Sequence, residues 1–356
     1  MHPTQRIRSV LMPLLGLLLG ACERAPAPSG PEYGAAPQTS AVPLYRLAIH
    51  PLHNPQKLSQ AYQPLIDHLN RNLPEARFEL EASRDYAAYE VKFRACEPHF
   101  LLPNPWQSLQ AMKVGYQIIA MAGNAEDFKG IFIVRKDSPI KTPADLKGKA
   151  VSYPAPTALA AAIMPQWFLH QQGIDVNRDI ENRYVGSQES SILNVFSKDV
   201  AVAATWPPPW RAFQKDHPAE AAELKVIWET PHLLNNSVMA RDDVPAAIRE
   251  RVQSLLAGLQ ETEEGRAILA GMETARFHPA DDASYAPVRE FIERFEKEVR
   301  PVETNWHGEA SPKIMKHRLA MPVSLSPNSL PGGERDVGSL REFHAKPAET
   351  KPVEQK

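Results

Sequence analysis

The chain has 356 residues, enough for two compact lobes with sizeable cores. Its formal net charge is −2 and its acidic and basic residues are dispersed, which argues against the basic face of a nucleic-acid-binding protein. Many of the 34 prolines fall near the two ends, so a folded body is expected between two extended segments.

Residues 1–22 are typical of a bacterial lipoprotein signal peptide. Two arginines precede a short apolar core at residues 10–19, which is too short to remain as a spanning helix. The core ends in Leu-Gly-Ala-Cys, where small residues admit a signal peptidase and the Cys22 thiol would receive a lipid. A plain secretory peptide with an incidental cysteine is the alternative. A lipid on Cys22 would anchor the protein on the periplasmic side of a membrane. Glu23, where an aspartate would indicate inner-membrane retention, favours the outer membrane.

The segments on either side of the folded body have low hydrophobicity. Residues 23–43 are rich in Pro and Ala and are predicted to form a tether. Residues 301–356 are polar and Pro-rich, and the sequence predicts a disordered tail. The folded body is therefore expected between residues 44 and 300.

The first part of the body alternates short apolar runs with amphipathic ones. This alternation indicates a mainly parallel sheet covered by helices. Strands are expected at residues 44–49, 78–82 and 99–103, and helices at 57–72, 85–94 and 106–114.

The pattern restarts at residue 130. Strands are expected at residues 130–135, 149–153, 183–185, 200–204, 224–228 and 236–241, and helices at 142–148, 157–172, 188–196 and 246–260. The simplest account is two sheets, with the chain crossing from one to the other and returning. Lobe 1 would then comprise residues 44–123 and 231–300, and lobe 2 residues 124–230.

Four segments, in order along the chain, resemble phosphonate- and phosphite-type solute-binding proteins of ABC transporters. They are Arg-Asp-Tyr-Ala-Ala-Tyr at 84–89, the Arg-Lys-Asp-Ser and Ala-Asp-Leu-Lys-Gly-Lys runs within 135–149, Gly-Ser-Gln-Glu-Ser-Ser-Ile-Leu at 186–193, and 226–231. The resemblance implies an α/β, two-lobed type II periplasmic-binding-protein fold with a two-strand hinge and a ligand in the cleft.

The chain departs from that family where the family's ligand site would lie. The family holds phosphoryl oxygens at a helix start with the sequence Ser-Thr-Ser-Gly, and this chain has Pro-Thr-Ala-Leu at 156–159. Gln188 replaces a family histidine, and Thr205 and Trp206 begin the run that replaces family acidic residues. These departures argue against a doubly charged phosphonate.

Ligands of open α/β sheets lie beyond the carboxyl ends of the strands. There, helix starts at Thr157 and Ser187 could hold an anion on free N–H groups, or could be ordinary N-caps. Aromatic rings such as Trp106 suit an apolar or cationic part of a ligand, or could simply pack the lobes together. An uncharged set of donors and acceptors fits a small neutral or singly charged ligand. The candidate ligand-binding residues are Tyr86, Asn104, Trp106, Tyr153, Thr157, Ala158, Ser187, Gln188, Thr205 and Trp206.

No enzyme motif is present, and no cofactor or metal is expected. The sequence has no Gly-x-Ser-x-Gly elbow, no His-Glu-x-x-His and no phosphate-binding Gly-rich loop. His50 and His53 lie in a Pro-flanked loop without nearby carboxylates or thiols, which favours structural roles over metal binding. Cys96 precedes a strand instead of following one, so it should lie away from the cleft. We expect it to act as a small hydrophobic residue rather than a thiol ligand.

The sequence is compatible with two functions. The first is a lipid-anchored protein that captures a small oxyanion or polar organic solute and delivers it to an ABC permease. The second is a ligand-sensing or scaffolding lipoprotein that acts on a sensor kinase or an assembly partner. The altered ligand site and the long tail favour the second function slightly, whereas the resemblance favours the first.

Overall fold

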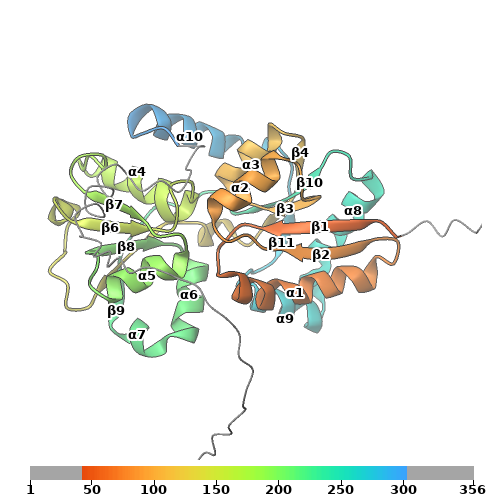
Figure 1. The fold of residues 1–356 in the computed structure, drawn as a ribbon, viewed down its shortest axis with the longest axis horizontal. Coiled ribbons are helices and arrows are strands. Elements are labelled where there is room, and N and C mark those ends of the chain that lie inside the picture. Colours follow the sequence, from red (N-terminus) through yellow and green to blue (C-terminus); the bar gives the residue numbers. More distant parts are fainter. Residues whose placement is uncertain (1–41, 303–356) are drawn as a thin grey trace, which may run out of the picture. The chain divides into compact units, whose positions relative to one another are not determined.

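The structure, a computed structural model, describes residues 42–302. The predicted signal peptide with Cys22, nearly all of the predicted tether and all but the first two residues of the predicted tail lie outside the described residues. Figure 1 shows two groups of strands, each covered by helices. None of the helices between residues 42 and 302 combines the length and hydrophobicity that a bilayer-spanning segment requires.

The first sheet, with the helices that cover it, is called lobe 1. Its six strands have the order β11-β4-β10-β3-β1-β2. The strands are β1 (Leu44–Ile49), β2 (Arg77–Glu81), β3 (Phe100–Leu102), β4 (Tyr116–Ala122), β10 (Ser237–Arg241) and β11 (Phe277–Pro279). The helices are α1 (Pro55–Asn72), α2 (Tyr86–Arg94), α3 (Pro105–Met112), α8 (Ala246–Gly258), α9 (Glu263–Gly271) and α10 (Ala286–Glu298), with short 3-10 turns η1 (Ala125–Asp127), η4 (Leu259–Glu261) and η5 (Ala283–Tyr285).

The second sheet, with its helices, is called lobe 2. Its five strands have the order β7-β6-β8-β5-β9. The strands are β5 (Ile131–Arg135), β6 (Ala150–Tyr153), β7 (Glu181–Tyr184), β8 (Val202–Thr205) and β9 (Leu224–Glu229). The helices are the 3-10 turn η2 (Pro143–Leu146), the π-helical turn η3 (Leu159–Ile163), α4 (Met164–Gln171), α5 (Gln188–Phe196), α6 (Pro207–Asp216) and α7 (Pro218–Ala222).

The predicted two-lobed α/β fold is confirmed, but both sheets are mixed rather than mainly parallel. The ladders β2-β1-β3 and β7-β6-β8 are parallel, as the β-α alternation predicts. Every antiparallel pair includes a strand next to a crossing: β10 pairs with β3 and β4, β11 with β4, and β5 with β8 and β9. Strands β10 and β5 each enter their lobe directly from the other lobe, without the crossover helix that parallel neighbours need. They can therefore pair antiparallel.

The two crossing segments lie side by side, as expected for a two-strand hinge. The Thr230 N–H donates to the Gly130 carbonyl at 2.9 Å, and the Gly130 N–H donates to Thr230 Oγ1 at 2.9 Å. The Leu233 N–H donates to the Phe128 carbonyl at 2.9 Å. These bonds satisfy backbone groups in the crossing segments, which have no sheet partners at this point.

The end of α10 joins the lobes at a second place. Helix α10 packs on α3 of lobe 1 (Figure 1). Its Phe291 ring meets the Trp167 ring of α4 edge-on, with centroids 5.9 Å apart. Just after α10, Arg300 Nη2 donates to the Pro156 carbonyl at 2.9 Å. Arg300 therefore fixes the loop that precedes Thr157.

Gly130 lies where this hinge touches the start of the helix that follows Thr157. A Cβ at this position would lie 2.6 Å from the Ala160 carbonyl oxygen and 2.7 Å from Pro165 Cγ. Such contacts are too short for real Cβ atoms, so we expect Gly130→Ala to lower the free energy of unfolding by about 1–3 kcal/mol. Gly258→Ala is the control, because nothing lies within 4 Å of the added Cβ and alanine suits the helix. Urea denaturation compares the two, and an unchanged midpoint for Gly130→Ala would contradict this packing.

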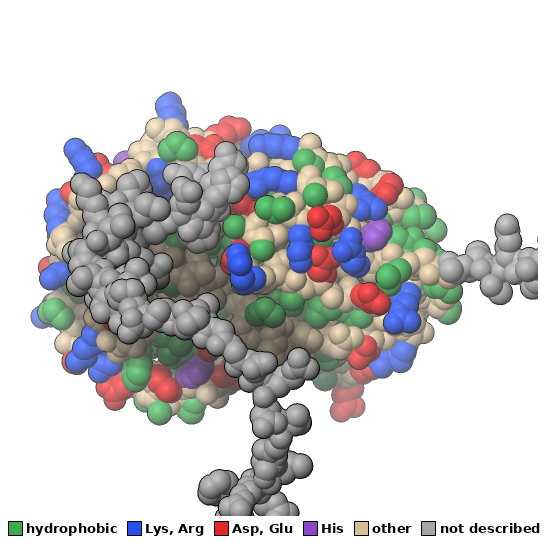
Figure 2. Space-filling view, in the orientation of Figure 1, with side chains coloured by type: hydrophobic (Ala, Val, Ile, Leu, Met, Phe, Trp, Pro, Cys, Tyr) green, Lys and Arg blue, Asp and Glu red, His purple; other side chains and the backbone are tan. Residues whose placement is uncertain are grey.

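Charges on the visible face of lobe 1 are mixed rather than segregated. Figure 2 shows Lys and Arg side chains interspersed with Asp and Glu side chains over this lobe. Ion pairs within lobe 1 include Arg46 with Glu81 at 3.2 Å and Lys92 with Glu81 at 2.8 Å.

Candidate ligand-binding site

The carboxyl ends of four strands bring most of the predicted residues to one place between the lobes. Asn104 follows β3 in lobe 1, while the segments that follow β6, β7 and β8 belong to lobe 2. A small cavity lies there, and five of the ten predicted residues line it: Tyr86, Asn104, Ala158, Gln188 and Trp206. Its lining also includes His50, Phe128, Leu159, Ala160, Ala161 and Asn236, which were not among the candidates.

Three buried hydrogen bonds cross from one lobe to the other at this cavity. Asn104 Nδ2 donates to the Thr157 carbonyl at 3.1 Å, and Gln188 Nε2 donates to the Tyr86 hydroxyl at 3.1 Å. The Thr157 hydroxyl donates to Glu90 Oε1 at 2.6 Å. The predicted residues therefore contact one another across the lobes, through polar atoms that would otherwise be buried without partners.

Asn104 is fixed by a capping box at the start of α3. Its side-chain oxygen accepts from the Gln107 N–H at 3.1 Å, and Gln107 Oε1 accepts from the Asn104 N–H at 3.1 Å. This leaves the Asn104 amide nitrogen free to reach lobe 2. The remaining Gln107 nitrogen donates to Glu90 Oε1 at 3.3 Å, so one network links α2, α3 and Thr157.

The start of the helix after β6 differs from the prediction. The helix begins at Leu159 with a π-helical turn and no side chain caps it, so the alternative in which Thr157 is an ordinary N-cap is wrong. This turn continues directly into α4. The Thr157 hydroxyl instead donates to the Glu90 carboxylate of lobe 1. π-helical turns are frequent at functional sites, which fits the position of this one beside the cavity.

Ser187 and Gln188 lie as the start of α5 requires. Ser187 caps the helix, since its Oγ accepts from the Ser190 N–H at 3.0 Å. Gln188 comes next and is buried, and its side-chain oxygen accepts from the Thr205 hydroxyl at 2.8 Å. Thr205 thus orients the Gln188 amide so that its nitrogen faces Tyr86. Ser187 and Thr205 support the cavity without lining it.

The aromatic candidates divide into cavity and core. Trp206 lines the cavity and meets Phe128 edge-on, with ring centroids 5.5 Å apart. Tyr86 also lines it, 6.1 Å from the His50 ring. Trp106 and Tyr153 are 1% and 0% exposed within the apolar core and do not line the cavity.

Glu90 is the charged group that the sequence prediction missed. It is buried beside the Thr157 hydroxyl, and Arg94 Nη1 lies 3.6 Å from its second oxygen. Burial raises the pKa of Glu90, while the bonds from Thr157 and Gln107 and the nearby Arg94 oppose that shift. Glu90 lies four residues after Tyr86 on α2, so helical spacing was the available signal.

The cavity lining itself contains no lysine or arginine. Burial lowers the pKa of His50 to about 4, although its bond to the Leu102 carbonyl opposes the shift. His50 is therefore neutral at pH 7. The lining thus offers amides, a hydroxyl and aromatic rings, with the Glu90 carboxylate as the adjoining charge.

The cavity is small because the lobes lie against each other. The cavity volume is about 10 Å³, which is about the size needed to hold a single water molecule. A larger ligand requires the lobes to separate at the hinge before it can enter.

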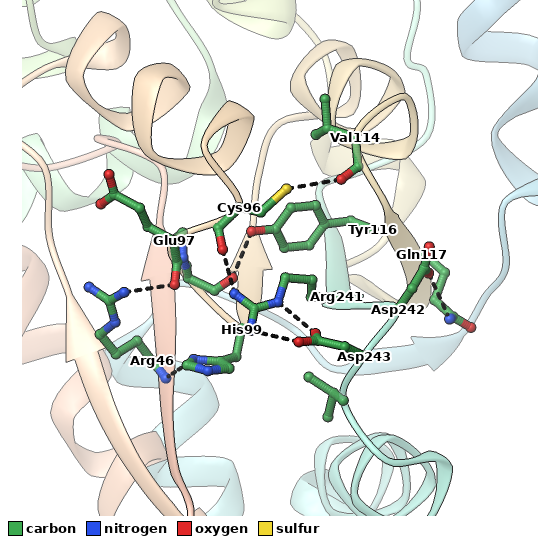
Figure 3. A network of polar contacts seen from close by, with 12 residues as sticks. Arg46, Cys96, Glu97, His99, Val114, Tyr116, Gln117, Arg241, Asp242 and Asp243 are labelled. Atoms are coloured by element: carbon green, nitrogen blue, oxygen red, sulfur yellow. Dashed lines mark hydrogen bonds and ion pairs between the residues drawn. The ribbon is translucent and has the colours of Figure 1, made fainter.

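Cys96 lies in a separate polar network at the opposite ends of the lobe 1 strands (Figure 3). The Cys96 thiol donates to the Val114 carbonyl at 3.0 Å, and the Arg241 guanidinium donates to the Cys96 carbonyl. The Tyr116 hydroxyl donates to the Pro98 carbonyl at 2.6 Å nearby. Between residues 42 and 302, no three His, Cys, Asp or Glu side chains are grouped as a metal site would require.

Comparison with known proteins places this geometry in a family. The family model of the phosphonate periplasmic substrate-binding protein of ABC transporters matches residues 47–285. The phosphonates-binding periplasmic protein of Escherichia coli is 23% identical over 188 residues, which cover 52% of this chain and 55% of that protein. A probable phosphite-binding protein of Prochlorococcus marinus is 23% identical over 193 residues, which cover 51% of this chain and 65% of that protein. The chain thus spans less than two thirds of either relative.

Solved structures with similar folds include two from such transporters. A binding protein of a Pseudomonas aeruginosa phosphonate transporter superposes with a TM-score of 0.67 at 18% identity, covering 78% of this chain and 94% of that one. PhnD1 of Prochlorococcus marinus, solved with methylphosphonate, superposes with a TM-score of 0.65 at 19% identity, covering 71% of this chain and 98% of that one. With the family model matching most of the folded body, the chain belongs to the family of periplasmic substrate-binding proteins of phosphonate ABC transporters.

Proposed function

We propose that the protein captures a small solute between its lobes and delivers it to an ABC permease. The observation that carries this proposal is the meeting of strand-end residues from both lobes around one cavity, with Asn104 bonded to Thr157 and Tyr86 to Gln188. Ligands of α/β sheets lie at such strand ends, and a hinge allows them to enter and be enclosed.

The proposed solute is a small oxyanion or a small polar organic molecule, neutral or singly charged. The relatives are named for phosphonate and phosphite. This chain has a cavity between its lobes. Its lining supplies the amides of Gln188, Asn104 and Asn236 for hydrogen bonds, and the rings of Tyr86 and Trp206 for an apolar or cationic part. A doubly charged group would meet no balancing cation in this lining.

We also propose that the protein works from a membrane surface. The signal peptide would export it, and a lipid on Cys22 would hold it on the periplasmic side, with the outer membrane favoured. The residues between Cys22 and β1 would tether the lobes. Mass spectrometry of the mature amino terminus tests this, because a diacylglyceryl cysteine has a distinctive mass.

The solute is tested by binding measurements on two cavity variants. We expect native mass spectrometry of protein purified from its own host to show a retained small molecule. Isothermal titration with that molecule, alongside methylphosphonate, phosphite and phosphate, should then show at least tenfold weaker binding for Gln188→Ala and for Trp206→Ala.

Trp210→Ala is the matched control for Trp206→Ala. Trp210 lies on α6 and stacks on Phe213 inside lobe 2, outside the cavity lining. Its loss should leave affinity unchanged. Equal weakening by Trp206→Ala and Trp210→Ala, or full affinity in Gln188→Ala, would count against a solute site at this cavity.

A further inference from the structure

Glu90 holds an unusual position for a carboxylate in this protein. It is 5% exposed, and its Oε1 accepts the Thr157 hydroxyl from the other lobe at 2.6 Å. Gln107 donates to the same oxygen at 3.3 Å. This lobe 1 side chain therefore makes the shortest of the three polar bonds that cross the lobes at the cavity.

Thr157 lies just before a helix start, where an anion is favoured. The first N–H groups of a helix have no acceptor within it, and the helix dipole adds partial positive charge there. The turn that begins at Leu159 runs into α4, and its Ala160 and Ala161 line the cavity. The chain thus brings its own carboxylate to the place in lobe 2 that suits a bound anion.

The contacts of Glu90 are not confined to lobe 1. Its ion pair with Arg94, at 3.6 Å, joins two residues of the same helix, α2. The close bond is the one to lobe 2, and it must break whenever the lobes separate. Any anionic solute that used the Thr157 hydroxyl would have to displace the carboxylate first.

We propose that Glu90 is a tethered anion that closes the cleft without a solute and competes with anionic solutes for Thr157. The proposal rests on the proposed solute-binding function and specifies its charge preference. A dianion is disfavoured in this cleft for two reasons. It must break the Glu90–Thr157 bond, and it is then repelled by the nearby Glu90 carboxylate. Neutral and positively charged solutes avoid the repulsion.

Two substitutions separate closure from charge. Glu90→Ala removes both the acceptor and the charge, so it should loosen the lobes. Glu90→Gln keeps a carbonyl oxygen that can accept from Thr157 but removes the charge, so it should spare much of the closure while admitting anions.

Glu81 supplies the matched control. Its side chain is 13% exposed at the end of β2, and its ion pairs with Arg46 and Lys92 stay within lobe 1. Glu81→Ala and Glu81→Gln therefore remove a largely buried carboxylate without touching the cleft. Thermal melting of all four variants verifies that each is folded before the comparison.

Closure is measured by hydrogen exchange on the full-length protein without added solute. Glu90→Ala should raise the exchange rate of amides in peptides that cover residues 155–163 at least tenfold over wild type. Glu81→Ala should leave those rates unchanged, and strand β5 should stay protected in both. Wild-type rates in Glu90→Ala would overturn the proposal.

Competition is measured by isothermal titration with methylphosphonate and with phosphate. Glu90→Gln should bind at least one of them tenfold or more tightly than wild type, while Glu81→Gln should match wild type. Equal or weaker binding by Glu90→Gln would overturn the competition with anions. If host-purified wild type carries no solute but Glu90→Ala still opens, the solute-binding function fails and the closing role of Glu90 stands.

Discussion

Trp106→Ala is expected to lower the free energy of unfolding by about 3–5 kcal/mol, the range for removing a large buried ring from a core. Trp106 is 1% exposed at the start of α3 and belongs to the apolar cluster that includes Tyr89 and Tyr116. Removing the indole leaves a cavity that the short helix cannot fill by shifting, because the Asn104 capping box fixes its start.

Trp106→Phe separates the loss of volume from the loss of the polar atom. Among the described residues the Trp106 Nε1 has no hydrogen-bond partner, so phenylalanine removes an unsatisfied donor along with some volume. We therefore expect Trp106→Phe to cost less than half as much as Trp106→Ala. Urea denaturation followed by circular dichroism measures both, and Trp210→Ala, at a half-buried ring, should also cost less.

The same pair of variants tests the role of Trp106. The sequence predicts a ligand-binding ring, whereas the structure places this ring in the core. Solute affinity in Trp106→Phe should thus equal that of wild type. A tenfold loss of affinity without a loss of stability would restore the original prediction.

The fold was predictable because strand–helix alternation is a local property. The segments that form β1, α1, β5 and β6 show the apolar spacing of a strand or a helix in the sequence itself. The order of strands and helices then indicates which residues follow each strand. Asn104, Gln188 and Trp206 were found in this way. The antiparallel pairs at the crossings were not, because pairing direction depends on how two distant segments meet.

Contacts between the lobes could not be predicted from either lobe alone. Glu90 is one of many acidic residues on helices, and its importance appears when Thr157 is brought to it from the other sheet. The π-helical turn has a local cause that the prediction overlooked. Pro165 has no N–H and its ring crowds the carbonyl of the preceding turn, which disfavours a regular α-helix at this point.

Stability is expected to fall steeply in acid because two buried histidines resist protonation. Burial lowers the pKa of His50 to about 4, and burial, aided by Lys57 and His50, lowers the pKa of His53 to about 3. Unfolded histidine titrates near 6.5, so the unfolded chain gains protons first as pH falls. The stability that these residues contribute is complete above pH 6.5 and is lost as pH falls toward 4 and 3.

The size of this effect follows from the His50 shift. A difference of 2.5 pH units between 6.5 and about 4 corresponds to roughly 3 kcal/mol lost by the time His50 protonates. Asp216 faces His53 and opposes its shift, and the raised pKa of Glu90 acts in the reverse sense, favouring the folded state as pH falls. Between pH 6.5 and 4 the two lowered histidine pKa values together outweigh the raised pKa of Glu90, so the net stability falls.

Urea denaturation between pH 7 and pH 4 tests the assignment with single substitutions. His50→Gln can keep a donor for the Leu102 carbonyl, now 2.9 Å from His50 Nδ1, and it should flatten the pH dependence while lowering stability at pH 7. His232→Gln is the control, since that side chain is exposed, and its pH dependence should match wild type. If His50→Gln loses stability in acid as steeply as wild type, the acid sensitivity arises elsewhere, because a side chain that cannot titrate contributes no difference in bound protons.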